Sequence, residues 1–298
     1  MNIIKDYKYE LMVIMAITFS LMATVIVKLL DEVSFIEKLF FCYMTVLIVT
    51  VINIKRKKIS VKTNVKKKHF VRAVLGIMSL GTFYYVAPHM ELTDITALDY
   101  VYPLFILLNT FELHKEKIKK NYLGILFMSL VGAVLIINPK LNSEMIYIGI
   151  SLVAIYIQSF IPIYLNELKK TEKTEVILFY YSLTSVLVFG PMFILNFKPM
   201  SLKTIIGLIM IGICTSLFQY LNTTSYKYLE MNVISIYKNL RIVIATIFAV
   251  VVFKQEIVLQ EMVGIMLIVA GVLLSFKFNH HVSEDKEKLK ANTSNALR

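Results

Sequence analysis

The chain has 298 residues, of which 57% are hydrophobic, against about 45–50% in soluble domains. Its formal net charge of +12 lies mostly in short connecting segments, which indicates membrane topology and argues against nucleic-acid binding. The two cysteines, Cys42 and Cys214, lie in apolar segments and are interpreted as buried hydrophobic residues. Composition therefore favours an all-α integral membrane protein without a disulfide, metal site or cofactor.

Ten apolar segments follow one another along the chain, each close to the length of a membrane-spanning helix. No small-residue cleavage site follows the first, so we expect a retained helix and not a signal peptide. Pro162 is predicted to bend the sixth segment. The segments lie at 9–30, 33–54, 70–88, 93–113, 121–138, 145–166, 175–195, 204–222, 231–253 and 258–277.

Lysine and arginine residues gather in alternate loops. If the N-terminus is cytoplasmic, the inner loops include 55–72, 114–120 and 167–173, and 24 of the 32 Lys and Arg residues lie on that side. Because short cytoplasmic loops carry an excess of cations, the sequence predicts that both termini are cytoplasmic.

The two halves of the chain share an order of features. The same three features occur in order in 93–137 and in 231–276. The first is a predicted helix with some polar residues, the second is a loop with a glutamate (Glu116 or Glu256), and the third is a predicted helix that contains glycine. Five spans per half is an odd number, so the second half must be inserted upside down. Inverted repeats are typical of transporters, with the substrate site near the midplane. We predict two inverted five-helix repeats, 1–138 and 139–278, and a polar, disordered cytoplasmic tail, 279–298.

Two stretches carry a family resemblance. In "VRAVLGIMSLGTFYYVAPHMELTDITALDYVYPLF" (71–105), Arg72 opens the third helix, and Glu116 stands thirteen residues after Pro103. In "SYKYLEMNVISIYKNLRIVIATIFAVVVFKQE" (225–256), a Tyr-basic-x-Leu element occurs at 237–240. Over about residues 9–277 the chain resembles the EamA-type drug/metabolite transporters.

The resemblance has consequences for the substrate. The element at 237–240 is similar to one in the branch that contains bacterial S-adenosylmethionine importers. The family usually has an arginine within the second helix, where this chain has Cys42. If that arginine contacts substrate, a different substrate or a different cation is implied.

Two cations lie inside the ninth apolar segment, "MNVISIYKNLRIVIATIFAVVVF". A Lys or Arg at a helix centre costs about 2.5–3.5 kcal/mol, and Lys238 and Arg241 are close enough to repel each other. At 1.5 Å rise per residue, Asp99 lies within about 6 Å of the depth of Arg241, which predicts an ion pair. Lys238 would then pair with Glu112, face a cavity open to the cytosol, or bind substrate. Two alternatives stay open: the pair clamps the repeats together without binding substrate, or Lys238 extends to the interface.

Tyrosines and amides supply further candidate ligands, although tyrosines also serve as interface anchors and core residues. Amide side chains in apolar helices either line a cavity or bond neighbouring helices. We expect a site between the third, fourth, eighth and ninth helices. The candidate substrate-binding residues are Asp99, Lys238, Arg241, Tyr102, Tyr237, Tyr84, Gln158, Gln219 and Asn222.

Rival functions are a membrane-embedded enzyme and a pore. His89 and Asp94 have the spacing of the His-Asp pair of acyltransferases, in which Asp orients His as a general base. No Glu-Gly partner motif follows, and no zinc-protease, serine-hydrolase or Walker motif occurs. A channel or lipid scramblase would also suit repeats and buried charges. The sequence favours a transporter over these alternatives.

The sequence therefore predicts a secondary-active transporter of a small polar or zwitterionic metabolite, such as an amino acid or S-adenosylmethionine. It would work by alternating access in a bacterial cytoplasmic membrane, as a monomer or homodimer, with H⁺ as a possible coupling ion. Asp99 would couple to protons or bind a substrate cation, and Lys238 and Arg241 would bind a carboxylate or phosphate.

The predicted orientation is tested by labelling single cysteines on intact cells with a membrane-impermeant thiol reagent. We expect modification of Ser201→Cys, in an outer loop, and none of Ser60→Cys, in a basic inner loop. The unmodified chain is the control, since it has only Cys42 and Cys214. Labelling at position 60 alone would reverse the orientation.

Overall fold

A computed structural model describes most of the chain. The described residues are helical wherever their structure is regular, and no strand occurs among them. The all-α prediction is confirmed to that extent. The described residues are 8–90, 98, 101–102, 104–106, 108–109, 120–136, 145–229, 231–238, 240–254, 258–260, 262–271 and 273–274.

Six described helical stretches are long and apolar enough to cross a bilayer. Their bounds agree with the first, second, third, sixth, seventh and eighth predicted segments to within about one turn. The sixth stretch combines two helices. These helices are α2 (Lys8–Leu29), α3 (Phe35–Lys57), α4 (Lys66–Val86) with the 3-10 turn η1 (Ala87–His89), α8 (Met145–Ser159) with α9 (Ile161–Leu168), α10 (Thr174–Leu195) and α11 (Leu202–Ser225).

The remaining predicted spans are described only in part. The structure gives α7 (Lys120–Ile136), α12 (Met231–Lys238), α13 (Leu240–Phe253) and a shorter apolar helix, Met262–Gly271. Residues of the predicted span 93–113 are described only at single positions and short runs. The count of ten helices and the inverted relation of the halves therefore stay predictions.

Local sequence signals set several helix ends. Ser34 and Glu37 form a capping box at the start of α3, in which each side chain bonds the other residue's backbone N–H. The Ser201 hydroxyl accepts from the backbone N–H of Thr204 at the start of α11. Pro162 lies in the first turn of α9, where its missing N–H costs little, and α8 ends just before at Ser159. The predicted bend at Pro162 is thus a break between two helices.

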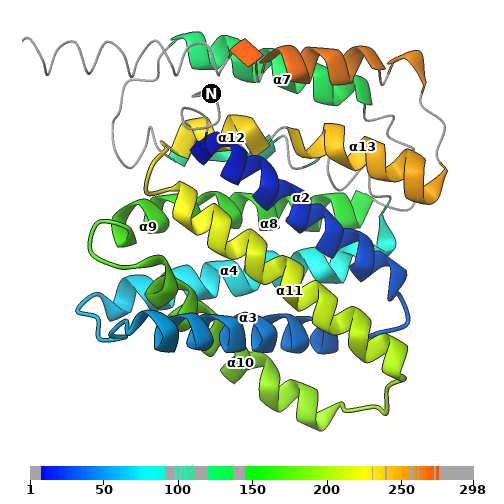
Figure 1. Ribbon diagram of the computed structural model, residues 1–298. Coiled ribbons are helices and arrows are strands. Elements are labelled where there is room, and N and C mark those ends of the chain that lie inside the picture. The colour runs from blue at the N-terminus through cyan, green and yellow to red at the C-terminus, as the bar shows by residue number, and fades with distance from the viewer. Residues whose placement is uncertain are drawn as a thin grey trace, which may run out of the picture.

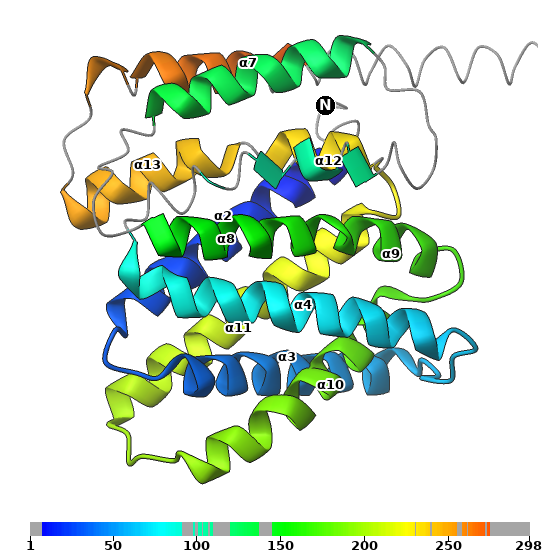
Figure 2. The ribbon, with the colours of Figure 1, turned by 180° about the vertical axis from the view of Figure 1, so that it is seen from behind.

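The two halves of the chain pack against each other through most of the long helices. Helix α2 packs on α11, α3 on α10 and α11, and α4 on α8 and α10. Figures 1 and 2 show these helices running side by side, with their connections gathered at two ends. The halves are therefore interleaved and share one core.

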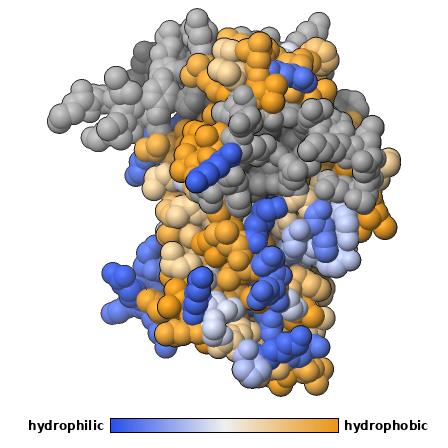
Figure 3. Space-filling model, turned by 90° about the vertical axis from the view of Figure 1, so that its right-hand side faces the viewer, coloured by the Kyte–Doolittle hydropathy of each residue, from blue (hydrophilic) through white to orange (hydrophobic). Residues whose placement is uncertain are grey.

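The outer surface of the helices is apolar. Large hydrophobic side chains such as Ile48 and Ile52 on α3 and Leu187 and Ile194 on α10 are exposed. Figure 3 looks onto the end that carries the turns at 30–34 and 196–201, and hydrophilic residues lie among hydrophobic ones there. Apolar sides with charged ends fit a bundle surrounded by lipid.

The close approach of α3 and α11 gives a stability prediction. A Cβ at Gly212 would lie 2.4 Å from Cβ of Thr45, so Gly212→Ala forces the helices apart. Overpacking costs about 1–3 kcal/mol, more than the roughly 1 kcal/mol that alanine gains over glycine in a helix. We expect a melting temperature several degrees lower by thermal unfolding of the purified protein.

The matched control is Gly149→Ala in α8, where a Cβ would meet nothing within 4 Å. This change should leave the melting temperature unchanged or slightly raised. Equal melting temperatures for the two variants would show that the α3–α11 contact is not tight.

Candidate functional site

A cavity lies between the two halves of the chain. Its volume is about 70 Å³, below the roughly 300–1,000 Å³ of most small-molecule sites, and it is partly open to solvent. Its lining comes from α4, α8, α9, α10, α11 and α12 and from the helical residue Tyr102. Segments predicted as the third, fourth, eighth and ninth helices all contribute to it.

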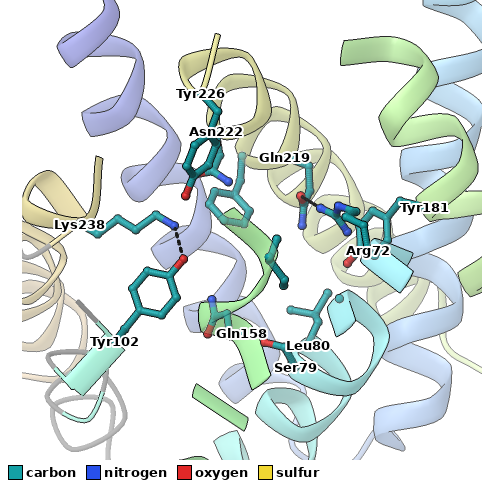
Figure 4. A pocket seen from close by; sticks show the side chains of 13 residues that line it. Arg72, Ser79, Leu80, Tyr102, Gln158, Tyr181, Gln219, Asn222, Tyr226 and Lys238 are labelled. Atoms are coloured by element: carbon teal, nitrogen blue, oxygen red, sulfur yellow. Dashed lines mark hydrogen bonds between the residues drawn. The ribbon is translucent and has the colours of Figure 1, made fainter. Parts of the chain in front are cut away.

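Five of the predicted site residues line this cavity: Lys238, Tyr102, Gln158, Gln219 and Asn222. The Lys238 ammonium donates to the Tyr102 hydroxyl at 3.4 Å and lies 4.8 Å from the centre of that ring. Figure 4 shows this pair on one side of the cavity, with Gln158 and Asn222 between it and the opposite wall.

Three other predicted residues do not line the cavity. The Tyr84 hydroxyl lies 3.7 Å from Sγ of Cys42 in the core, and Tyr237 is buried in a different apolar cluster. Arg241 donates from Nη2 to the Thr24 hydroxyl at 3.3 Å, and its guanidinium lies 5.6 Å from the centre of the Phe83 ring. Lys238 and Arg241 therefore have different surroundings.

The predicted carboxylates Asp99, Glu112 and Asp94 lie outside the described residues. The pairing of Asp99 with Arg241 therefore stays a prediction. His89, the other half of the acyltransferase-like pattern, stacks on Tyr147 with ring centres 4.5 Å apart.

Arg72 of α4 lines the opposite wall of the cavity and was not predicted as a site residue. Its side chain is only 2% exposed, and its guanidinium stacks on the Tyr181 ring, 3.8 Å from the ring centre. Nη2 donates to Oε1 of Gln219 at 3.3 Å. In the sequence Arg72 belongs to a run of basic residues, so it was interpreted as a topology signal. Because α4 begins at Lys66, Arg72 lies about 9 Å into the helix.

Gly76 makes room for this arrangement, one turn after Arg72. A Cβ at position 76 would lie 2.7 Å from Nη1 of Arg72 and 2.6 Å from Cε2 of Tyr181. Any larger residue would displace the stacked pair. The Arg-x-x-x-Gly spacing on an apolar helix is the sequence signal that could have identified Arg72.

The buried guanidinium is costly as it stands. Nε and Nη1 have no hydrogen-bond partner among the described groups. A buried donor left without a partner costs about 1–3 kcal/mol, and more on a charged group. The Tyr181 stack offsets part of this cost, since a desolvated cation over an aromatic ring gains about 2 kcal/mol.

A second, smaller cavity continues from the first. It has a volume of about 30 Å³, shares Ser79 and Gln158 with the first cavity, and extends to Thr82 and Ser151. Thr82 lies near the η1 end of α4, and Ser151 lies in the first half of α8. This second, mostly apolar cavity thus lies further from the Lys66 end of α4.

Two ion pairs and one histidine–carboxylate contact lie near the Lys66 end of α4. Lys57 lies 2.6 Å from Glu175, Lys68 lies 2.7 Å from Glu167, and Nε2 of His69 lies 3.8 Å from Glu172. We call these six residues the ion-pair cluster. The two ion pairs and the His69–Glu172 contact each join a residue of 57–69 to one of 167–175, and thus one half of the chain to the other. His69 precedes Arg72 by three residues, so the cluster lies one helical turn from the cavity.

A polar cavity between two interleaved halves of an apolar helical bundle defines a multi-pass membrane transporter. The chain matches the EamA-like transporter family over residues 8–138 and 145–277, and it belongs to that family. It is accordingly a transporter and not an enzyme.

Named relatives cover the chain to different extents. The pseudopaline exporter CntI of Pseudomonas aeruginosa is 24% identical over 175 residues, which span 58% of this chain and only 62% of the exporter. An uncharacterized transporter of Helicobacter pylori is 27% identical over 86% of this chain and 90% of its own length. A riboflavin transporter of Brucella anthropi is 24% identical over 69% of this chain and 74% of its own length.

A solved crystal structure has the same fold. It is 16% identical in sequence, with a TM-score of 0.72, and the match covers 91% of this chain and 98% of the other. The likeness supports the arrangement of helices described above and carries no information on substrate.

The ion-pair cluster predicts the outcome of a charge exchange. Glu175→Lys places a cation against Lys57 and should lower the melting temperature, while the double variant Lys57→Glu/Glu175→Lys restores most of the loss. The coupling energy should be about 1 kcal/mol or less, because the Lys57 side chain is 50% exposed. Thermal unfolding of the wild type, the two single variants Lys57→Glu and Glu175→Lys, and the double variant in low salt measures it.

Lys62→Glu is the control for the exchange. Lys62 is an exposed lysine in the connection between α3 and α4, five residues after Lys57. Its side chain has no ion pair among the described residues. It should not rescue Glu175→Lys. If it rescues as well as Lys57→Glu does, the effect is one of net charge and the cluster does not join the halves.

Proposed function

We propose that the protein is a secondary-active transporter of a small polar or zwitterionic metabolite that works by alternating access. The observation that carries this proposal is the cavity between the two halves, where Arg72 and Lys238 face polar side chains inside an apolar bundle. Ionisable residues within membrane helices mark substrate or ion pathways. A site at the interface of two repeats is the arrangement that alternating access requires.

The two ends of the cavity differ in a way that supports this mechanism. The ion-pair cluster lies near one end, and the second cavity lies toward the other. In the predicted orientation the end near the cluster is cytoplasmic. Breaking the cluster would let the halves separate there, and the Arg72–Tyr181 side of the cavity would then open to the cytosol.

The residue roles in this proposal follow from position. Lys238 and Tyr102 hold one part of the substrate, with Gln158, Gln219 and Asn222 as hydrogen-bonding partners. Asp99 binds a substrate cation or a coupling proton. Asp99 also pairs with Arg241 and holds the Arg241 guanidinium in position. The inverted repeats 1–138 and 139–278, the tail 279–298, the bacterial cytoplasmic membrane and the cytoplasmic termini belong to the same proposal.

The substrate proposal is limited to a chemical class. The relatives named as exporters or transporters of pseudopaline and riboflavin place metabolite transport in related chains. An amino acid or S-adenosylmethionine is our proposed substrate type for this chain, because each combines a carboxylate with a cationic group.

Counterflow in liposomes tests the transporter proposal. The purified protein is reconstituted into vesicles preloaded with an unlabelled amino acid or S-adenosylmethionine, and uptake of the labelled compound is followed. A carrier gives saturable uptake that the preloaded solute accelerates. Flux that is linear in concentration and insensitive to preloading would instead show a channel, and lipid movement alone would show a scramblase.

Lys238→Gln separates recognition from stability. We expect the KM for transport to rise about 10- to 100-fold, since a hydrogen bond to a charged group contributes about 1.5–3 kcal/mol. The melting temperature should change little, because Lys238 lines the cavity and glutamine keeps a polar side chain there. Lys203→Gln, an exposed lysine at the start of α11, is the control. Transport with an unchanged KM would show that Lys238 serves topology.

A further inference from the structure

Arg72 has no counter-ion among the described residues. No Asp or Glu appears in the described lining of the cavity, and the hydrogen bond from Nη2 goes to a neutral amide, that of Gln219. Nε and Nη1 are buried without a described partner. The fold therefore carries a buried cation with two donor atoms that the described side chains do not satisfy.

The surroundings hold this cation in place without using those donors. Tyr181 covers one face of the guanidinium, and Gly76 leaves room beside it. The Tyr181 hydroxyl donates to the Tyr43 hydroxyl at 3.1 Å, which fixes the ring in turn. A planar cation fixed on one face, with N–H groups left over, is preorganised to bind an oxyanion.

The rest of the cavity determines which ligands fit. Figure 4 shows Lys238 and Tyr102 across the cavity from Arg72, Gln219 and Tyr181. The described lining thus presents a cation at each side and neutral hydrogen-bonding groups between them. This charge distribution favours a ligand with an acidic group and disfavours a polycation such as a diamine.

We propose that Arg72 binds an acidic group, a carboxylate or a phosphate, of the transported metabolite. Several acceptor oxygens on one small group satisfy the charged donors that are otherwise buried without partners. The remainder of the metabolite extends toward Lys238. This inference rests on the proposed function and names the substrate class for the same cavity.

The first test is ligand-induced stabilisation of the purified full-length protein. The probes are inorganic phosphate, succinate, L-glutamate and S-adenosylmethionine, with succinamide as the neutral counterpart and putrescine as the cation, all at equal ionic strength. We expect a saturable rise in melting temperature of about 4 °C at 100 times the Kd for at least one acidic probe. Stabilisation by phosphate alone would indicate a phosphorylated substrate. Stabilisation by the other acidic probes would indicate a substrate with a carboxylate.

The second test is Arg72→Gln, because glutamine removes the charge and keeps a polar side chain. It should abolish the ligand-induced shift, whereas Arg56→Gln, an exposed arginine at the end of α3, should keep it. Without ligand, Arg72→Gln should melt at the same temperature or higher, since it removes buried donors that have no partner.

Three outcomes would overturn the inference. The first is stabilisation by the neutral or cationic probes only, or by no probe. The second is a ligand-induced shift that persists in Arg72→Gln. The third is a ligand-free melting temperature of Arg72→Gln several degrees below that of the wild type, as expected of a purely structural arginine. Failure of the proposed function looks different. Saturable counterflow of a cationic solute would sustain the transporter and refute the acidic-group site, whereas Arg72-dependent binding without counterflow would do the reverse.

Discussion

The stack of the Arg72 guanidinium on the Tyr181 ring joins the two halves of the chain at the cavity. Arg72 belongs to α4 in the first half, and Tyr181 belongs to α10 in the second. In lipid, each polar group must find its partners inside the protein. The position of this one cation therefore constrains several neighbours at once: Gly76 must be small, Gln219 must present its oxygen, and Tyr181 must keep its ring fixed.

The same requirement explains the separation of charges within the bundle. At the end near Lys66, where water reaches the side chains, lysines meet glutamates directly, as in the pair Lys57–Glu175. One turn further in, Arg72 meets an aromatic ring and an amide instead. A carboxylate at that depth would neutralise the cation permanently, whereas neutral partners leave the charge available to a ligand that comes and goes.

The sequence was informative where a signal depends on local composition. Hydropathy placed the six described spans to within about a turn, and apolar segments with isolated amides pointed to Gln158, Gln219 and Asn222, which lie at the cavity. It was uninformative where the outcome depends on how helices rotate against their neighbours. Tyr84 and Tyr237 were equally plausible candidates, yet their helices turn both side chains into apolar clusters.

The two cations of the ninth segment show the same limit. The sequence argument placed Lys238 and Arg241 on one face of a single helix. In the structure the two cations contact different neighbours, Lys238 the Tyr102 hydroxyl and Arg241 the Thr24 hydroxyl. The sequence does not identify Arg72 as a site residue for a related reason. A run of basic residues predicts that a loop is cytoplasmic, but only the position where α4 begins shows which residue of that run lies inside the bundle.

The ion-pair cluster also has a consequence for biogenesis. Lys57 and Glu175 are 118 positions apart, so the lysine is synthesised well before its partner. At about 5–20 residues per second, the interval is on the order of ten seconds. Helix α2 waits longer still, because α11, on which it packs, is among the later spans. During this time the first spans must be held in the membrane with their polar faces unmatched. The insertion machinery or the lipid headgroups must therefore cover these polar faces until the second half of the chain is inserted.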